Sequence, residues 1–212
     1  MRRAGVVLSR AGERVGNHWL IYNPWLFRHF HERAVANAPG VMRAIDAVLP
    51  HRVRLLDVGA GSGAFAAEAK RRGKDVVACE HSRAGRKMAA RQGVRCYPFD
   101  LERDPPVAVS GSFDLALCLE VAEHLPEHLG VRLVRFLSVS APVVVFSAAQ
   151  PGQGGTGHVN ERPKAHWIDA FASAGMRFDA RRSTALAERF EAERVVDYLV
   201  RNVIVVRDED DV

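Results

Sequence analysis

An acid followed by a glycine-rich turn is the chemical feature that stands out first in the chain. Residues 57–63 read D-V-G-A-G-S-G and lie between a short apolar run and an amphipathic stretch. Glycines at alternate positions let the backbone turn tightly and approach a ligand. Nicotinamide and flavin sites favour the spacing G-x-G-x-x-G to hold a pyrophosphate, which an acid at position 57 would repel. The turn favours a ligand that carries an ammonium group and a sulfonium, with Asp57, Gly59, Ala60, Gly61 and Gly63 as its binding residues.

Two further acids stand at the ends of the next two predicted strands. Glu80 follows the second of these apolar runs, and a carboxylate about 20 residues past the glycines is where α/β cofactor sites bind ribose hydroxyls. Asp100 follows the third run. Taken alone, Asp100 fits a turn or a helix N-cap equally well. Its register with Asp57 and Glu80 favours a place in the same site.

Together these residues resemble the class I S-adenosylmethionine-dependent methyltransferases, whose first motif reads (D/E)-x-G-x-G-x-G at the end of the first strand. The resemblance implies S-adenosyl-L-methionine as the cofactor and S-adenosyl-L-homocysteine as the product. It also implies that Glu80 holds the ribose, that His81 borders the adenine, and that Asp100 and Leu101 flank the adenine.

The segment after the fourth predicted strand is similar to that of small-molecule methyltransferases. The resemblance implies that the backbone near Leu119 and Glu120 lines the methionine end of the cofactor. Glu123 and His124 are candidates to lie near the transferred methyl group, although acids also suit the first turn of a helix. His124 and His128 are expected one helical turn apart, but we find no third ligand with suitable spacing and therefore expect no metal.

A second glycine-rich segment follows the fifth predicted strand. Residues 151–161 read P-G-Q-G-G-T-G-H-V-N-E and resemble a bacterial methyltransferase subgroup with this loop. Ordering so many glycines is entropically costly, which favours a lid that closes over a substrate. A hydroxyl acceptor must lose its proton, and His158 is the candidate base because imidazole titrates near neutrality. A purely structural role of His158 is the alternative, with Glu161, Gln153 and His124 as other catalytic candidates.

The elements that position these residues alternate from residue 52 onward. Strands are predicted at 53–58, 75–79, 94–97, 113–119, 143–146 and 203–206, and helices at 63–73, 83–92, 127–139, 163–174 and 186–200. Such alternation predicts right-handed βαβ crossovers in a doubly wound, mostly parallel α/β sheet. The resemblance adds the seven strands of the Rossmann-like methyltransferase fold. Ligands of such sheets lie beyond the carboxyl ends of the strands.

Residues 1–50 precede this domain as a predicted N-terminal helical cap of two or three helices, interrupted by Pro24, Pro39-Gly40 and Pro50. In the resembling fold such a segment covers the acceptor pocket. The segment carries an aromatic cluster made of Trp19, Tyr22, Trp25, Phe27 and Phe30, of which the first four either line that pocket or pack the helices onto the sheet. The methyltransferase domain is expected over 51–207, and the acidic residues of 208–212 are expected to form a solvated tail.

Composition points to a globular protein of the cytoplasm. The formal charge of +5 is spread over the chain without a block of like charges, so it does not by itself indicate a nucleic-acid partner. The three cysteines lack metal-site spacing and are expected to be buried thiols. No apolar run approaches the length of a signal-peptide core or of the roughly 20 residues that span a membrane. We expect a monomer or homodimer.

The expected activity is methylation of a small molecule, with a hydroxyl of a sugar or secondary metabolite as the acceptor suggested by the resemblance. An RNA-modifying methyltransferase is one alternative. The D-P-P-V segment at 104–107 does not support it, because it precedes the fourth strand and lacks the aromatic residue that stacks on a flipped base. A non-catalytic cofactor-binding scaffold is the other alternative, since a fold does not fix a function.

Overall fold

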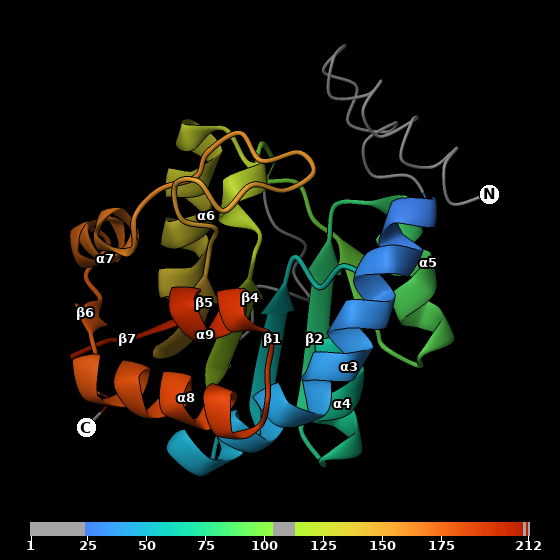
Figure 1. The fold of residues 1–212 in the computed structure, drawn as a ribbon, viewed down its shortest axis with the longest axis horizontal. Coiled ribbons are helices and arrows are strands. Elements are labelled where there is room, and N and C mark those ends of the chain that lie inside the picture. Colours follow the sequence, from blue (N-terminus) through green and yellow to red (C-terminus); the bar gives the residue numbers. More distant parts are fainter. Residues whose placement is uncertain (1–23, 104–112, 210, 212) are drawn as a thin grey trace.

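The computed structural model describes residues 24–103, 113–209 and 211. A seven-stranded sheet with the order β3-β2-β1-β4-β5-β7-β6 forms its centre (Figure 1). Neighbouring strands are parallel except at β7, which runs antiparallel to both β5 and β6. This confirms the predicted doubly wound, mostly parallel α/β fold. The strands are β1 Arg54–Val58, β2 Asp75–Glu80, β3 Cys96–Pro98, β4 Leu115–Leu119, β5 Val143–Ser147, β6 Arg177–Phe178 and β7 Ile204–Arg207.

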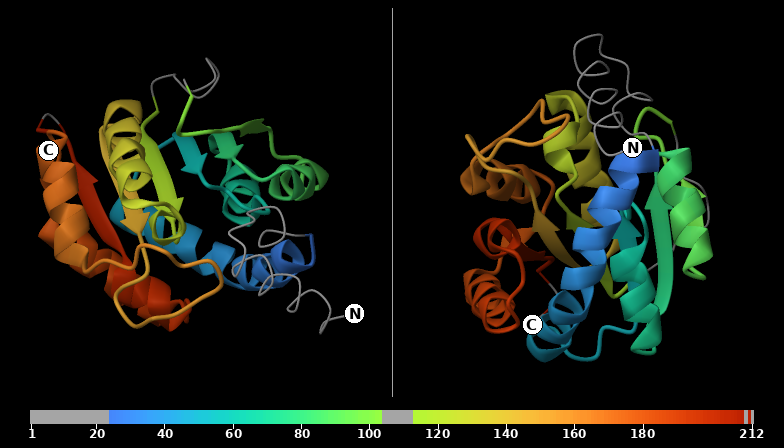
Figure 2. Two further views of the ribbon diagram at one scale, coloured as in Figure 1. Left: turned by 90° about the horizontal axis from the view of Figure 1, so that it is seen from above. Right: turned by 45° about the vertical axis from the view of Figure 1, so that its right-hand side comes forward.

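Helices cover both faces of the sheet (Figure 2). They are α3 Pro24–Val48, α4 Ala64–Arg71, α5 Arg83–Arg91, the 3-10 turn η2 Ala122–His124, α6 Glu127–Ser140, α7 Lys164–Ser173, α8 Ala180–Ala192 and α9 Asp197–Asn202. Apolar residues of α6 and α7 pack on one face, and those of α3, α8 and α9 pack on the other. Central strands are therefore buried on both sides, which explains why β5 is apolar at four successive positions and buried at all five.

The prediction of two or three helices over residues 1–50 is tested only from residue 24 onward, where the described part of the chain begins, and within that part the predicted interruption at Pro39-Gly40 is wrong. Residues 24–48 form one continuous helix, α3, with Pro39 inside it. A proline in a helix interior removes a backbone hydrogen bond and normally bends or ends the helix. Here the buried side chains on both sides of Pro39, among them Ala38 and Val41, hold the helix together through packing. The predicted aromatic residues Trp19 and Tyr22 lie outside the described residues.

The last predicted helix, over 186–200, is also different. The chain forms two helices there, α8 and α9, and α8 begins earlier than expected because Asp179 caps it by accepting a hydrogen bond from the Arg182 amide at 2.8 Å. Between the two helices Arg194 has a positive φ of 57°, a conformation that only a minority of non-glycine residues adopt. The break directs α9 toward the carboxyl ends of the strands.

The acidic C-terminal segment is not solvated along its whole length. Asp211 accepts hydrogen bonds from the guanidinium groups of Arg52 and Arg182, and its side chain is only 9% exposed. The prediction of a solvated tail is wrong at this residue, because two arginines of the domain compensate its charge. Cys79 and Cys118 are buried free thiols, as predicted, whereas Cys96 is partly exposed. Among the described helices, none combines the length and apolar character that crossing a membrane requires.

Candidate functional site

A cleft lies at the carboxyl ends of the parallel strands, where the sequence placed it. It consists of two adjoining cavities of about 480 and 440 Å³. Phe30 of α3, Glu120 after β4 and the glycine turn after β1 line both cavities. Above this edge of the sheet, Figure 1 shows the long loop between β5 and α7 in orange. Predicted site residues from five separate segments therefore line these two adjoining cavities, whereas the predicted Gly63 and Glu161 line neither of them.

The glycine turn between β1 and α4 has the backbone that its sequence predicts. Gly59, Gly61 and Gly63 have φ values of 72°, 55° and 77°, which glycine adopts without steric cost. The glycines were predicted to leave space for a ligand, but at two of them the space is filled by side chains of the protein. A Cβ on Gly59 would lie 2.5 Å from a methyl carbon of Val121, and one on Gly63 would lie 2.7 Å from the Ala89 side chain. At these two positions the absent side chain makes room for the protein's own packing.

Asp57 ends β1 with its carboxyl group buried beneath this turn. Its side chain lines the 440 Å³ cavity and is 3% exposed. Among the described residues, its Oδ2 atom has no hydrogen-bond partner. Burial, together with the nearby Glu80 carboxylate, raises the pKa of Asp57 to about 7. A buried carboxylate without a partner is costly, so a cationic ligand in this cavity would relieve an unfavourable state.

Glu80 ends β2 and lines the 480 Å³ cavity. Its two carboxylate oxygens accept backbone hydrogen bonds, from Gly61 at 2.9 Å and from Ser82 at 2.6 Å. Burial raises the pKa of Glu80, while these two amides act in the opposite direction. Each oxygen has a second lone pair, so the carboxylate can still accept hydrogen bonds from ligand hydroxyls. Its place beside the turn matches the predicted ribose-binding role.

The residues predicted to surround an adenine line the same cavity. His81, Asp100 and Leu101 contribute to its wall together with Phe99. His81 Nδ1 lies 3.2 Å from the Phe99 carbonyl oxygen. One Asp100 oxygen accepts a hydrogen bond from the backbone of Glu102 at 3.0 Å, which is the turn-forming contact that sequence reasoning weighed as the alternative. Asp100 thus forms a turn and also lines the cavity.

Glu120 lines both cavities. It directly follows β4 with a positive φ of 54°, an uncommon conformation for a residue other than glycine. Its carboxylate accepts hydrogen bonds from the side-chain amides of Gln153 at 2.9 Å and Asn202 at 3.0 Å. The Asn202 amide also donates to the Gln153 side-chain oxygen at 2.8 Å, and its own oxygen accepts from Gln150 at 3.1 Å. This network fastens the loop over the strand ends.

Gln153 is therefore a structural member of that network, whereas it was predicted as an alternative catalytic group. Asn202 was missed by sequence reasoning, because no local pattern marks a residue at the end of α9 as a partner of Glu120. Leu119 and Ala60, both predicted at the cofactor site, line the 440 Å³ cavity beside Asp57. Arg33 of α3 and Tyr198 of α9 also line it and were not predicted.

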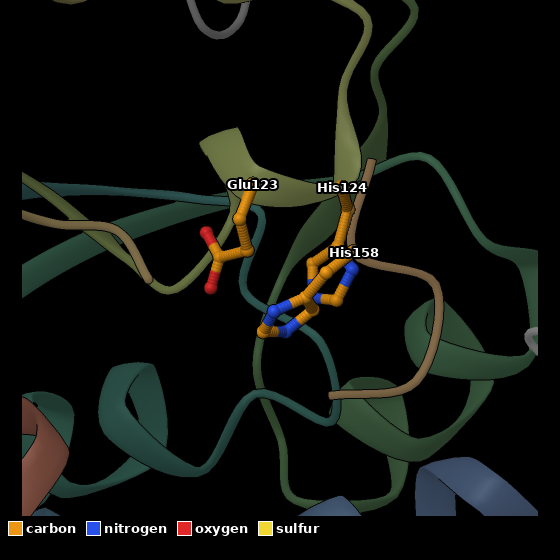
Figure 3. Close-up of side chains that lie close together, drawn as sticks. All are labelled: Glu123, His124 and His158. Atoms are coloured by element: carbon orange, nitrogen blue, oxygen red, sulfur yellow. The ribbon is translucent and has the colours of Figure 1, made fainter. Parts of the chain in front are cut away.

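Glu123, His124 and His158 come together at the loop side of this cavity (Figure 3). One ligand-type atom from each side chain lies within 4.8 Å of the others. The imidazole rings of His124 and His158 meet edge to face, with centroids 4.9 Å apart. Glu123 is fully buried, and within the described parts of the chain neither of its carboxylate oxygens has a hydrogen-bond partner. Burial and the nearby Glu120 raise the pKa of Glu123 well above its usual range.

The other side of this cluster is built by the glycine-rich loop. His158 Nδ1 lies 2.8 Å from Glu161 Oε1, and the Glu161 carboxylate also accepts hydrogen bonds from the backbone amides of Gly152 and Gly154, each at 2.8 Å. The hydrogen bond from His158 lowers the pKa of Glu161. Glu161 is thus an ionised group that fixes the His158 ring. A Cβ on Gly155 would lie 2.3 Å from His158 Nε2, so glycine there gives the ring its space.

His124 and His128 were expected one helical turn apart, and this prediction is wrong. His124 ends the 3-10 turn η2, and α6 begins only at Glu127, after Leu125 and Pro126. The two histidines therefore do not follow one another on a single helix, and His128 is exposed. The histidine that lies beside His124 is His158. The sequence predicted His158 as a base but did not predict that it lies near Glu123.

Comparison with known proteins identifies the family and the fold of the chain. A family model described as a methyltransferase domain matches residues 27–193, which is most of the chain. No curated protein matches the sequence. Similar solved structures include the sugar N-methyltransferase KedS8 from Streptoalloteichus sp., with a TM-score of 0.65, 19% identity and coverage of 87% of this chain and 92% of that chain.

Two other solved structures are similar at the same level. The amino pentose methyltransferase CalS10 from Micromonospora echinaspora has a TM-score of 0.60 and 18% identity, and the match covers 81% of this chain and 91% of that chain. A TehB-like methyltransferase from Corynebacterium glutamicum has a TM-score of 0.64 and 18% identity, with 88% and 99% covered. At such identities the three likenesses show the fold.

Proposed function

The chain belongs to the methyltransferase domain family and uses S-adenosylmethionine as its cofactor; from this premise we propose that it methylates a hydroxyl group of a small molecule bound in the 440 Å³ cavity. A sugar or a secondary metabolite is the acceptor class that we propose. The observation that carries the proposal is the cleft itself, in which Asp57 and the His124–His158 pair line the 440 Å³ cavity and Glu80 lines the adjoining 480 Å³ cavity.

The residues present fit the methyl donor. Asp57 offers a buried carboxylate oxygen without a partner, which suits the donor's ammonium group. Glu80 would bind the ribose hydroxyls, and His81, Asp100 and Leu101 would surround the adenine. When bound, S-adenosylmethionine supplies a methyl group on a sulfonium, which is already a strong electrophile. The protein's tasks are therefore to align the acceptor with that group and to exclude water.

The acceptor end of the cavity supports a polar small molecule. Its wall combines Phe30, Arg33 and Asn37 from α3 with Tyr198 and Arg201 from α9. Such alternation of aromatic and hydrogen-bonding groups suits a ring with several hydroxyls. The names of KedS8 and CalS10, a sugar N-methyltransferase and an amino pentose methyltransferase, also support a sugar. They suggest an amino nitrogen as the alternative acceptor atom.

A hydroxyl acceptor has to lose its proton during methyl transfer. At the acceptor end, the described groups that can take this proton or lower the pKa of the hydroxyl are those around His158, which Glu161 holds in one orientation. We assign activation of the acceptor to this group, with His158 at its centre and His124 beside it. The Gln153–Asn202 network acts differently, because it positions the loop and Glu120.

Replacing His158 with alanine tests this assignment. Turnover with an accepted substrate should fall by about 100-fold or more, which is the typical contribution of proton-transfer groups. The dissociation constant for S-adenosylmethionine should stay nearly the same, because the proposed polar contacts of the donor are made by Asp57 and Glu80 and not by His158. The His128→Ala variant removes an exposed histidine outside the cluster and should behave like the wild type. Unchanged turnover in His158→Ala would remove His158 from the mechanism.

A further inference from the structure

We infer that Glu123, His124 and His158 form a binding site for one divalent transition-metal ion, such as Zn²⁺, at the acceptor end of the cleft. The inference rests on the proposed function for the role of the ion, but not for the existence of the site. Two imidazoles and one carboxylate are the ligand set of many catalytic zinc centres, which keep a further coordination position open. All three residues line the 440 Å³ cavity, so that open position faces the acceptor (Figure 3).

Glu123 gives the first independent argument. It is 0% exposed, and neither carboxylate oxygen makes a close hydrogen bond among the described residues, although the backbone amides of Glu123 and Ala149 offset part of the rise in its pKa. Burying such a group costs free energy unless it is paired, protonated or bound to a cation. Glu120, which is already held by two side-chain amides, and Glu161 both disfavour the ionised form of Glu123. A cation between Glu123 and the two imidazoles would resolve this unfavourable state.

The hydrogen bonds around both histidines give the second argument. His158 Nδ1 lies 2.8 Å from Glu161, and His124 Nδ1 lies 3.2 Å from the Gly157 carbonyl oxygen. When Nδ1 donates in both contacts, the neutral rings carry their lone pairs on Nε2. Histidines that bind metals are typically oriented in this way, by a carboxylate or a backbone carbonyl on the other ring nitrogen.

The backbone also preorganises the cluster. The amides of Val159 and Asn160 donate to the Glu123 carbonyl oxygen at 2.8 and 3.0 Å, which ties the loop that carries His158 to η2. Ligand atoms around a tetrahedral zinc ion lie roughly 3.3 Å apart, given bond lengths of about 2.0–2.2 Å. The three atoms here already lie within 4.8 Å of one another. Small rotations of the two rings would complete the site.

The kinds of ligand atom at this site determine which class of metal ion it would bind. Mg²⁺ and Ca²⁺ prefer sets of oxygen ligands, whereas imidazole nitrogens favour zinc, cobalt, nickel, copper and iron. An ion held here would lower the pKa of an acceptor hydroxyl that occupies its open position. In that case His158 acts as a ligand of the ion, and the acceptor's proton passes to water.

Metal titration of the purified full-length chain tests the inference without any acceptor. The protein is stripped with a chelator, and Co²⁺ is added while its visible absorption is followed; Zn²⁺ then competes for the same site. One equivalent of Co²⁺ should bind and Zn²⁺ should displace it. Glu123→Gln and His158→Ala should each weaken Co²⁺ binding by at least about tenfold, because each removes one of three ligands. The matched control His128→Ala should bind as the wild type does.

Absence of stoichiometric Co²⁺ binding to the wild type would overturn the inference, and Glu123 would then be a buried acid that keeps its proton. Equal weakening by His128→Ala would overturn it as well. His158 lies in a loop, so its variant stays informative if Glu123→Gln fails to fold. Titration of the same stripped samples with S-adenosylmethionine separates the two proposals. If the protein binds S-adenosylmethionine but no metal, the ion site alone is refuted. If it binds no S-adenosylmethionine, either after stripping or after loading with metal, the proposed function is refuted.

Discussion

Among the single side chains of the cleft, Asp57 combines burial, an oxygen without a partner and a pKa of about 7. These properties have one origin, because the strand end places a carboxyl group beneath the turn where water cannot solvate it. Only the ionised form attracts an ammonium group. Protons and the methyl donor therefore compete for Asp57.

The first consequence is a pH dependence of donor binding. Because the pKa of the free protein's Asp57 is raised, the protonated and weakly binding form predominates below about pH 7. The association constant for S-adenosylmethionine should fall about tenfold for each pH unit below that value and level off above it. Calorimetric titrations at about pH 5, 6 and 7 measure this slope. Asp57→Asn should bind weakly with little dependence on pH, and a wild-type affinity equal at about pH 5 and 7 would contradict the account.

The turn that joins β1 to α4 packs against Val121, a residue far along the chain. Gly59 needs its positive φ of 72°, and the side chain of Val121, after β4, fills the space next to its Cα atom. The same contact fixes the turn against the segment that leads into η2. Cofactor binding and the position of Glu123 and His124 are thereby connected through packing.

Gly59→Ala should destabilise the protein by about 2–4 kcal/mol, from the strained φ and from overlap with Val121. Thermal or urea unfolding measures this change. Gly73→Ala is the matched control, because Gly73 has a similarly positive φ of 86° but open space around it, and it should cost only about 1–2 kcal/mol. The second substitution Val121→Ala should recover part of the loss in the Gly59 variant. Equal destabilisation by the two single glycine variants would show that Val121 does not matter.

The parts of the site that were predictable are those with local causes. The glycine turn follows from φ requirements, and Asp57, Glu80 and Asp100 follow from the rule that the carboxyl ends of parallel strands meet at one edge. The closeness of Glu123 and His158 depends on the path of a loop that places His158 35 residues after Glu123, and no spacing in the sequence predicts it. Packing likewise overrode the local signal at Pro39, which lies inside α3, and at Arg194, where a residue other than glycine ends α8.

In the whole molecule, the residues of the cleft and a set of contacts that stabilise the fold lie at opposite ends of the strands. The carboxyl ends of the strands hold the costly buried acids of the cleft. At the opposite edge Arg52, just before β1, and Arg182 of α8 bind Asp211, and the Asp208 amide donates to the Pro142 carbonyl oxygen at 2.8 Å. These contacts secure the C-terminal segment against the sheet where no ligand is expected.

Titration calorimetry of the purified full-length chain with S-adenosylmethionine, beside the Asp57→Ala variant, shows whether this cleft binds the methyl donor through the Asp57 carboxylate. In separate titrations, the wild type should bind one equivalent of S-adenosylmethionine or one equivalent of S-adenosylhomocysteine. The variant should bind the donor roughly 10- to 100-fold more weakly, because it lacks one charge-assisted contact. A folded wild-type protein that binds neither compound, or a variant that binds the donor as tightly as the wild type, would contradict the assignment of this cleft.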